Sequence, residues 1–266
     1  MNSVSTNIPH EDLTTRHTPK FQIRDVPSTS PIKWFKLGIE DFKESFVASF
    51  SLGLLYVLIG TFMLWLAWEN PLYMATLVAS FLLIGPIIAV GFYFMSHSIE
   101  KGEKPSLMQG FKALKFNSIS LISFSLILAF LVGIWALVAT IITALYANSI
   151  VIGDDILTSL LGNESLLSFV LLYLAIGGIF SVIAFSISVI SVPLITNRKT
   201  DVVTAMITSV RVVIKNPIAM LSWAFLIATM IFLGMLFFYV GLAITLPIVG
   251  HASWHAYRDL VMDDNS

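Results

Sequence analysis

The longest charge-free segment of the chain limits most strongly what it can fold into. Between Lys215 and Arg258 there is no Asp, Glu, Lys or Arg. As a single helix, the 34 residues from Pro217 to Gly250 would extend about 51 Å, far beyond a hydrocarbon core of roughly 30 Å. We therefore predict two membrane spans here, joined by a turn near Gly234, where glycine permits a close reversal of the backbone.

Four further apolar runs are also free of charged residues. They cover residues 45–68, 72–96, 117–147 and 165–196, and each is long enough to cross a bilayer. Only 12% of the chain is charged and 57% is hydrophobic, whereas soluble domains carry about a quarter charged residues. The predicted fold class is an all-α, polytopic transmembrane helix bundle with six spans. The chain has no cysteine, which excludes disulfides, thiolate metal sites and cysteine nucleophiles.

Amphipathic segments precede the pairs of spans and indicate an internal repeat. We predict three helical-hairpin repeats at about 31–100, 101–197 and 198–260, each an amphipathic cytoplasmic helix followed by two spans. Residues 1–30 form a predicted disordered cytoplasmic tail, and residues 261–266 a short C-terminal tail. Pro86 and Pro193 are expected to kink their helices. The predicted apolar faces consist of Phe35, Ile39, Phe42 and Phe46 in the first segment, Leu107, Phe111 and Leu114 in the second, and Val202, Met206, Val210 and Val213 in the third. In the third segment, the opposite face carries Thr204, Thr208, Arg211 and Lys215.

The distribution of basic residues predicts the orientation. With six spans, all 15 Lys and Arg residues fall on one side, and the other side holds only the acids Glu69, Asp154, Asp155 and Glu164. Because cytoplasmic loops concentrate basic residues, both termini are expected in the cytoplasm.

Three histidines near the predicted cytoplasmic ends form the best candidate site. His251 and His255 are one helical turn apart, and His97 and Glu100 end the second span at the same depth. If the first and third repeats meet, these four side chains could supply ligands to a zinc-like or iron-like metal. The alternative is an interfacial belt, in which the histidines accompany the anchors Trp34, Trp254, Tyr257 and Arg258. No cofactor is predicted apart from this metal hypothesis.

The spans contain none of the ionised residues that coupled transporters place at membrane depth. A carrier or channel for a neutral or lipophilic solute stays open as an alternative, with serines of the middle pair of spans forming a polar seam or simply packing. No hydrolase elbow, phosphate loop, dinucleotide turn or zinc-protease pair occurs, so we do not expect an enzyme.

Three stretches carry a resemblance to a known family: WFKLGIED from Trp34, GPIIAVGFYFMSHSIEKGE from Gly85, and the terminal GHASWHAYRDL. They resemble the bacterial membrane protein family called domain of unknown function 2189 (DUF2189). The resemblance implies a multi-pass protein of the bacterial inner membrane without an established activity. Some members carry labels taken from cytochrome oxidase subunits, which implies, as an alternative, a metal- or haem-associated accessory subunit of a respiratory complex.

From these patterns we predict a structural, assembly or interaction component of the membrane. Its expected partners are the lipid bilayer and either other membrane proteins or a second copy of the chain. Nucleic acid is not an expected partner, because the formal net charge is −1.

Overall fold

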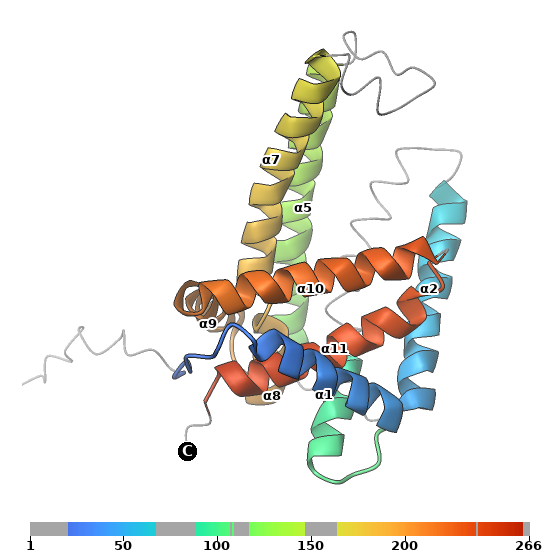
Figure 1. The fold of residues 1–266 in the computed structure, drawn as a ribbon, viewed down its shortest axis with the longest axis vertical. Coiled ribbons are helices and arrows are strands. Elements are labelled where there is room, and N and C mark those ends of the chain that lie inside the picture. Colours follow the sequence, from blue (N-terminus) through green and yellow to red (C-terminus); the bar gives the residue numbers. More distant parts are fainter. Residues whose placement is uncertain are drawn as a thin grey trace, which may run out of the picture.

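The computed structural model describes residues 21–67, 89–106, 108, 117–146, 164–237 and 239–262. This part of the chain is helical apart from short connections and one isolated antiparallel bridge between Ile23 and Val261. Figure 1 shows the arrangement of its elements. The helices are α1 (Ser30–Glu44), α2 (Phe46–Ala67), a segment over 89–100, α5 (Ser118–Tyr146), α7 (Glu164–Ser188), α8 (Ser191–Arg198), α9 (Val202–Lys215), α10 (Pro217–Leu236) and α11 (Leu242–Leu260).

The last helix, α11, is the centre of the fold. It packs along α1, α2 and α10, and small residues allow the backbones to approach closely. A Cβ atom at Gly38 of α1 would lie 2.7 Å from the backbone nitrogen of Ala252. A Cβ atom at Gly250 would lie 2.7 Å from the ring of Phe92. Both positions therefore require glycine, because any larger side chain would push two helices apart.

Large aromatic side chains fill the core around α11. Trp34, Trp223, Trp254 and Tyr257 are almost completely buried, and the rings of Trp34 and Trp223 meet edge to face at 5.8 Å. Such pairs bury a large apolar area in a defined geometry. The first and last helices are thereby held in one packed unit.

The two ends of the described chain also meet. The backbone nitrogen of Arg24 donates to the carbonyl of Leu260 at 2.9 Å, and Lys215 Nζ donates to the carbonyl of Ile23 at 2.6 Å. Phe21 and Ile23 are buried. The packed part of the chain thus begins before residue 30, within the segment assigned to the tail from the sequence.

The α5–α7 hairpin extends away from this packed unit (Figure 1). The two helices contact each other along their length through aromatic rings, including Trp135 against Tyr173 at 5.1 Å and Tyr146 against Phe169 at 5.7 Å. Only the base of the hairpin reaches α8 and α9 (Figure 1). Most of its surface is exposed and apolar.

The end of α7 confirms one predicted helix break. α7 ends at Ser188 and α8 begins at Ser191, two residues before Pro193. Proline has no N–H to donate to the carbonyl four residues earlier, so the regular helix is interrupted ahead of it. Pro86 lies outside the described residues.

Four helices of the described chain are long and apolar enough to cross a membrane: residues 46–63 of α2, all of α5, the α7–α8 stretch from Glu164 to Arg198, and α10. The all-helical membrane class is confirmed at this level. The last apolar stretch does form two helices, but its turn covers 237–241, and Gly234 instead packs against Leu242 and Thr245 of α11. The predicted second span lies mostly outside the described residues.

The amphipathic helices α1 and α9 use the expected faces in part, since Phe42 of α1 is buried and Val202, Met206 and Val213 of α9 pack against the core. In α1, Trp34, Gly38 and Asp41 are buried, while Phe35 and Ile39 are half-buried. In α9, Thr208, expected on the polar face, is buried beside Ser209, whereas the apolar side chains of Val203, Ile207 and Ile214 are exposed. Small side chains are favoured where helices pack closely, which explains why the apolar residues are left on the outer surface.

Candidate functional site: a buried polar network on α11

His251 is the centre of a polar network inside the packed unit. Its side chain is 0% exposed. Nε2 lies 2.8 Å from Oγ of Ser49 in α2, and Nδ1 lies 2.8 Å from Oγ of Ser96 in the 89–100 segment. A neutral imidazole has one N–H donor and one acceptor nitrogen, so one serine accepts a hydrogen bond and the other donates one. Three separate segments are joined through this one ring.

Ser45, at the junction of α1 and α2, extends the network. Its hydroxyl lies 2.6 Å from Oγ of Ser49 and 3.4 Å from His251 Nε2, and it is 2.7 Å from the carbonyl oxygen of Asp41. The Asp41 carboxylate, in turn, lies 2.8 Å from Nε2 of His255. Because a buried carboxylate is costly unless it is paired, the His255 contact stabilises Asp41 inside the protein.

The environment of His251 keeps its ring neutral. Burial is the main cause and lowers the pKa of His251 from 6.5 to about 4. The Asp41 carboxylate, 4.0 Å from Nδ1, acts in the opposite direction, and His255 adds to the lowering. His251 lies outside the four candidate spans. Because its pKa is lowered, the ring is a neutral hydrogen-bonding link at neutral pH.

Serine, histidine and aspartate also form the catalytic set of serine hydrolases, and the geometry here differs from that set. Ser49 and His251 are both 0% exposed, so a substrate has no access to the hydroxyl. The Nδ1 atom is hydrogen-bonded to Ser96, and Asp41 is 4.0 Å away, whereas a triad needs the carboxylate on that nitrogen. The arrangement therefore supports a structural network.

A second group lies one turn further along α11. Arg258 Nε is 3.5 Å from Oε2 of Glu100, and His97 Nδ1 is 3.9 Å from the same oxygen. The His97 ring also meets Trp254 edge to face at 5.2 Å. Burial alone would raise the pKa of Glu100, but His97, Arg258, Trp254 and His255 outweigh it and lower that pKa overall. Glu100 is thus a stable carboxylate.

A pocket of about 310 Å³ lies beside this second group. Its lining includes Tyr93, His97, Lys101, Asn197 and Trp254. Asn197 Nδ2 donates to the hydroxyl of Tyr257 at 2.9 Å, which holds the end of α8 against α11.

The structure arranges the four predicted metal ligands as two pairs. His251 and His255 share one face of α11 near Asp41, and His97 is close to Glu100. Within the described residues, no group of three or more His, Asp or Glu side chains could hold a metal ion. The joint metal site stays a prediction.

The predicted interfacial anchors lie in different surroundings. Trp34, Trp254 and Tyr257 are buried in the protein core, and Trp34 Nε1 donates to Asp259 at 2.8 Å. Arg258 is directed toward Glu100.

Sequence reasoning missed Asp41, Ser45, Ser49 and Ser96. A signal for the first three was present, because Asp41, Ser45 and Ser49 are spaced four residues apart where the chain enters an apolar run. On a helix this spacing forms one polar line.

The comparisons with known proteins support the conclusion that the chain is a membrane protein. Residues 73–197 match the family model DUF2189, described as a predicted integral membrane protein. The resemblance seen in the sequence is confirmed over that range. No curated protein and no solved structure matches the chain.

Proposed function

We propose that this integral membrane protein is a structural, assembly or interaction component of the bacterial inner membrane. We further propose that it binds the transmembrane helices of other membrane proteins through its α5–α7 hairpin. The observation that carries the proposal is the separation of this hairpin from the packed unit (Figure 1). Elsewhere α1, α2, α10 and α11 pack on one another, whereas α5 and α7 contact each other along their length and reach α8 and α9 at the base of the hairpin.

The surface of the hairpin suits helix partners. A Cβ atom at Gly133 of α5 or at Gly178 of α7 would meet nothing within 4 Å. These glycines leave shallow, open positions between exposed apolar side chains such as Phe130 and Leu174. Small residues at such positions allow two membrane helices to approach closely.

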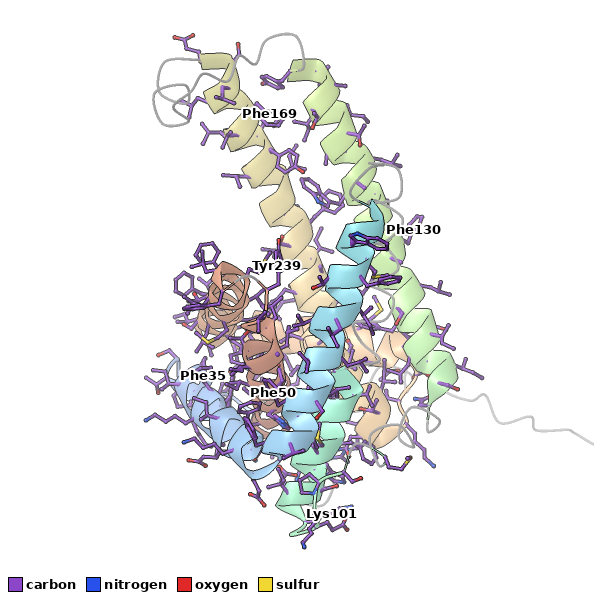
Figure 2. The ribbon with its side chains drawn as sticks, turned by 90° about the vertical axis from the view of Figure 1, so that its right-hand side faces the viewer. Phe35, Phe50, Lys101, Phe130, Phe169 and Tyr239 are labelled. Atoms are coloured by element: carbon purple, nitrogen blue, oxygen red, sulfur yellow. The ribbon has the colours of Figure 1, made fainter. Side chains whose placement is uncertain are left out.

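Lys101 lies at the opposite end of the molecule from Phe169 of α7 (Figure 2). Because the sequence predicts the Lys and Arg residues on one side of the membrane, we propose that the end with Lys101 and both termini face the cytoplasm. The six-span arrangement of three repeats stays a prediction.

A photo-crosslinking amino acid at position 130 would test the partner proposal in native membranes. Phe130 is 72% exposed on α5, and Phe124 of the same helix is 0% exposed and provides the matched control. We expect position 130 to crosslink one defined membrane protein, and position 124 to give no product. Crosslinking of lipid alone at positions 130 and 174 would refute the proposal, and a product containing only this chain would identify a homo-oligomer instead.

Among the described residues, the pocket near Trp254 favours a carrier for a neutral or lipophilic solute as the alternative. Flux of labelled solutes into liposomes containing the purified protein would establish that alternative. The metal- or haem-associated accessory role would require metal or haem in the purified protein that is lost in a variant combining His251→Ala and His255→Ala.

A further inference from the structure

The helix α10 differs from the other candidate spans in its direction. In Figure 1, α2, α5 and α7 run in roughly the same direction, and α10 runs across them. In the view turned by 90°, the last helices of the chain are foreshortened while α2, α5 and α7 are still seen along their length (Figure 2). Because a bilayer has a single normal, helices that cross each other in this way do not all span it.

The side of α10 that faces away from the protein is apolar. Met220 and Trp223 are buried against the packed unit, where α10 contacts α11 and α1. On the opposite side, Leu221, Phe225 and Phe232 are exposed, Phe225 to 73%. No charged residue occurs in the helix. An exposed face of this kind requires an apolar environment along its whole length.

The turn between α10 and α11 supplies an independent observation. Its sequence over 237–241 is FFYVG, without a single charged residue, and Phe237 is 70% and Val240 58% exposed. The predicted outer loops, in contrast, contain the acids Glu69, Asp154 and Asp155. A turn in water has no reason to expose such large apolar side chains.

Several backbone N–H groups of the described residues at this turn donate to carbonyls close by in the chain. The N–H groups of Tyr239, Val240 and Leu242 donate to the carbonyls of Met235, Phe237 and Tyr239 at 3.3, 3.1 and 3.0 Å, and those of Ala243 and Ile244 donate to Val240 and Gly241 at 3.0 Å. Backbone polar groups inside a bilayer must be paired within the protein, because lipid offers no partners. These short-range bonds lower the cost of placing the turn in the membrane.

We infer that α10 lies along the plane of the membrane, with its exposed face against lipid and its turn inside the bilayer. The α10–α11 hairpin then enters and leaves the membrane on the side of Lys101 without crossing it. Lipid is the occupant of the exposed face because this face is continuous with an uncharged, exposed turn. The inference does not depend on a protein partner for α5 and α7.

Single cysteines test this directly, since the chain has none of its own. Val240→Cys would be treated with a membrane-impermeant maleimide in vesicles of both orientations, with Lys101→Cys and Glu164→Cys marking the two aqueous sides. We expect no labelling of Val240→Cys from either side, and full labelling by a membrane-permeant maleimide. Labelling from the Glu164 side would show that the hairpin crosses the membrane, and labelling from the Lys101 side would place the turn in water. Either result would overturn the inference.

Spin labels along the exposed face give a second readout. We expect nitroxides at Ile218→Cys, Phe225→Cys and Phe232→Cys to lie at similar depths and to be accessible to oxygen dissolved in lipid. A depth that passes through a maximum at Phe225 would indicate a spanning helix. Low oxygen accessibility with spin–spin broadening would indicate a second copy of the chain on this face, and it would overturn the assignment to lipid.

Discussion

Replacing His251 by glutamine should change how the stability of the protein depends on pH. In the folded protein His251 keeps a pKa of about 4, whereas in the unfolded chain it returns toward 6.5. Between these values the unfolded chain binds more protons, so the free energy of unfolding falls as the pH falls from 6.5 toward 4. Since one pKa unit corresponds to about 1.4 kcal/mol, this histidine accounts for a loss of about 3 kcal/mol across the window. Above pH 6.5 its full contribution is present.

The measurement is unfolding of the detergent-solubilised protein at pH 7.5 and pH 4.5, followed by the fluorescence of the buried Trp34, Trp223 and Trp254. The wild type should lose about 2 to 3 kcal/mol more than His251→Gln on acidification. At pH 7.5 the variant should itself be less stable by about 1 to 3 kcal/mol, because the hydroxyls of Ser49 and Ser96 lose partners. His97→Gln, outside the network, is the matched control. Equal acid losses in the wild type and His251→Gln would refute the reasoning.

Three further substitutions test the packing and the hydrogen bonds. Gly38→Ala should lower the free energy of unfolding by about 1 to 3 kcal/mol, because its Cβ would lie 2.7 Å from Ala252. Gly133→Ala, whose Cβ would meet nothing within 4 Å, should leave that free energy unchanged or raise it slightly. Equal effects of the two variants in thermal unfolding would contradict the assignment of Gly38 to a close contact. Ser96→Ala should cost about 1 to 3 kcal/mol in the same assay by leaving His251 Nδ1 without its partner, whereas Ser181→Ala, which removes only a bond to a carbonyl of its own helix, should be neutral. Trp34→Phe should cost about 1 to 3 kcal/mol through loss of the 2.8 Å bond to Asp259 and of packing at a buried site, and the cost should be smaller when Asp259 is already replaced by alanine, which has no acceptor.

The helices of this protein could be predicted from the sequence because long apolar runs without charge have few alternatives to helix in a membrane. The predicted run 45–68 corresponds to α2, and the division of the last stretch gives α10 and α11. The direction of α10 could not be predicted in the same way. Hydropathy reports the surroundings of a helix, and it is the same for a helix that crosses lipid and for one that lies along it.

The site could be predicted in part. The spacing of His251 and His255 places them on one helix face, as the structure has them. Their partners were missed because Asp41 and Ser49 belong to the start of the chain and reach α11 only through tertiary packing. The meeting of His97 and Arg258 at Glu100 likewise depends on tertiary packing, here of the 89–100 segment against α11. Side chains brought together over such long sequence separations leave only a weak local pattern.

The polar network makes the packing of the first helices depend on α11. Its partners, α1, α2 and the 89–100 segment, all precede the α5–α7 hairpin in the chain. Until α11 arrives, Asp41, Ser49 and Ser96 lack the histidines that satisfy them, and an unsatisfied buried polar group costs about 1 to 3 kcal/mol. The first helices are therefore incomplete alone, whereas α5 and α7 contact each other along their length and meet the rest of the protein through α8 and α9. Docking of α11 brings Arg24 and Leu260 together, and the α5–α7 hairpin keeps the exposed apolar side chains through which we propose that it binds a partner.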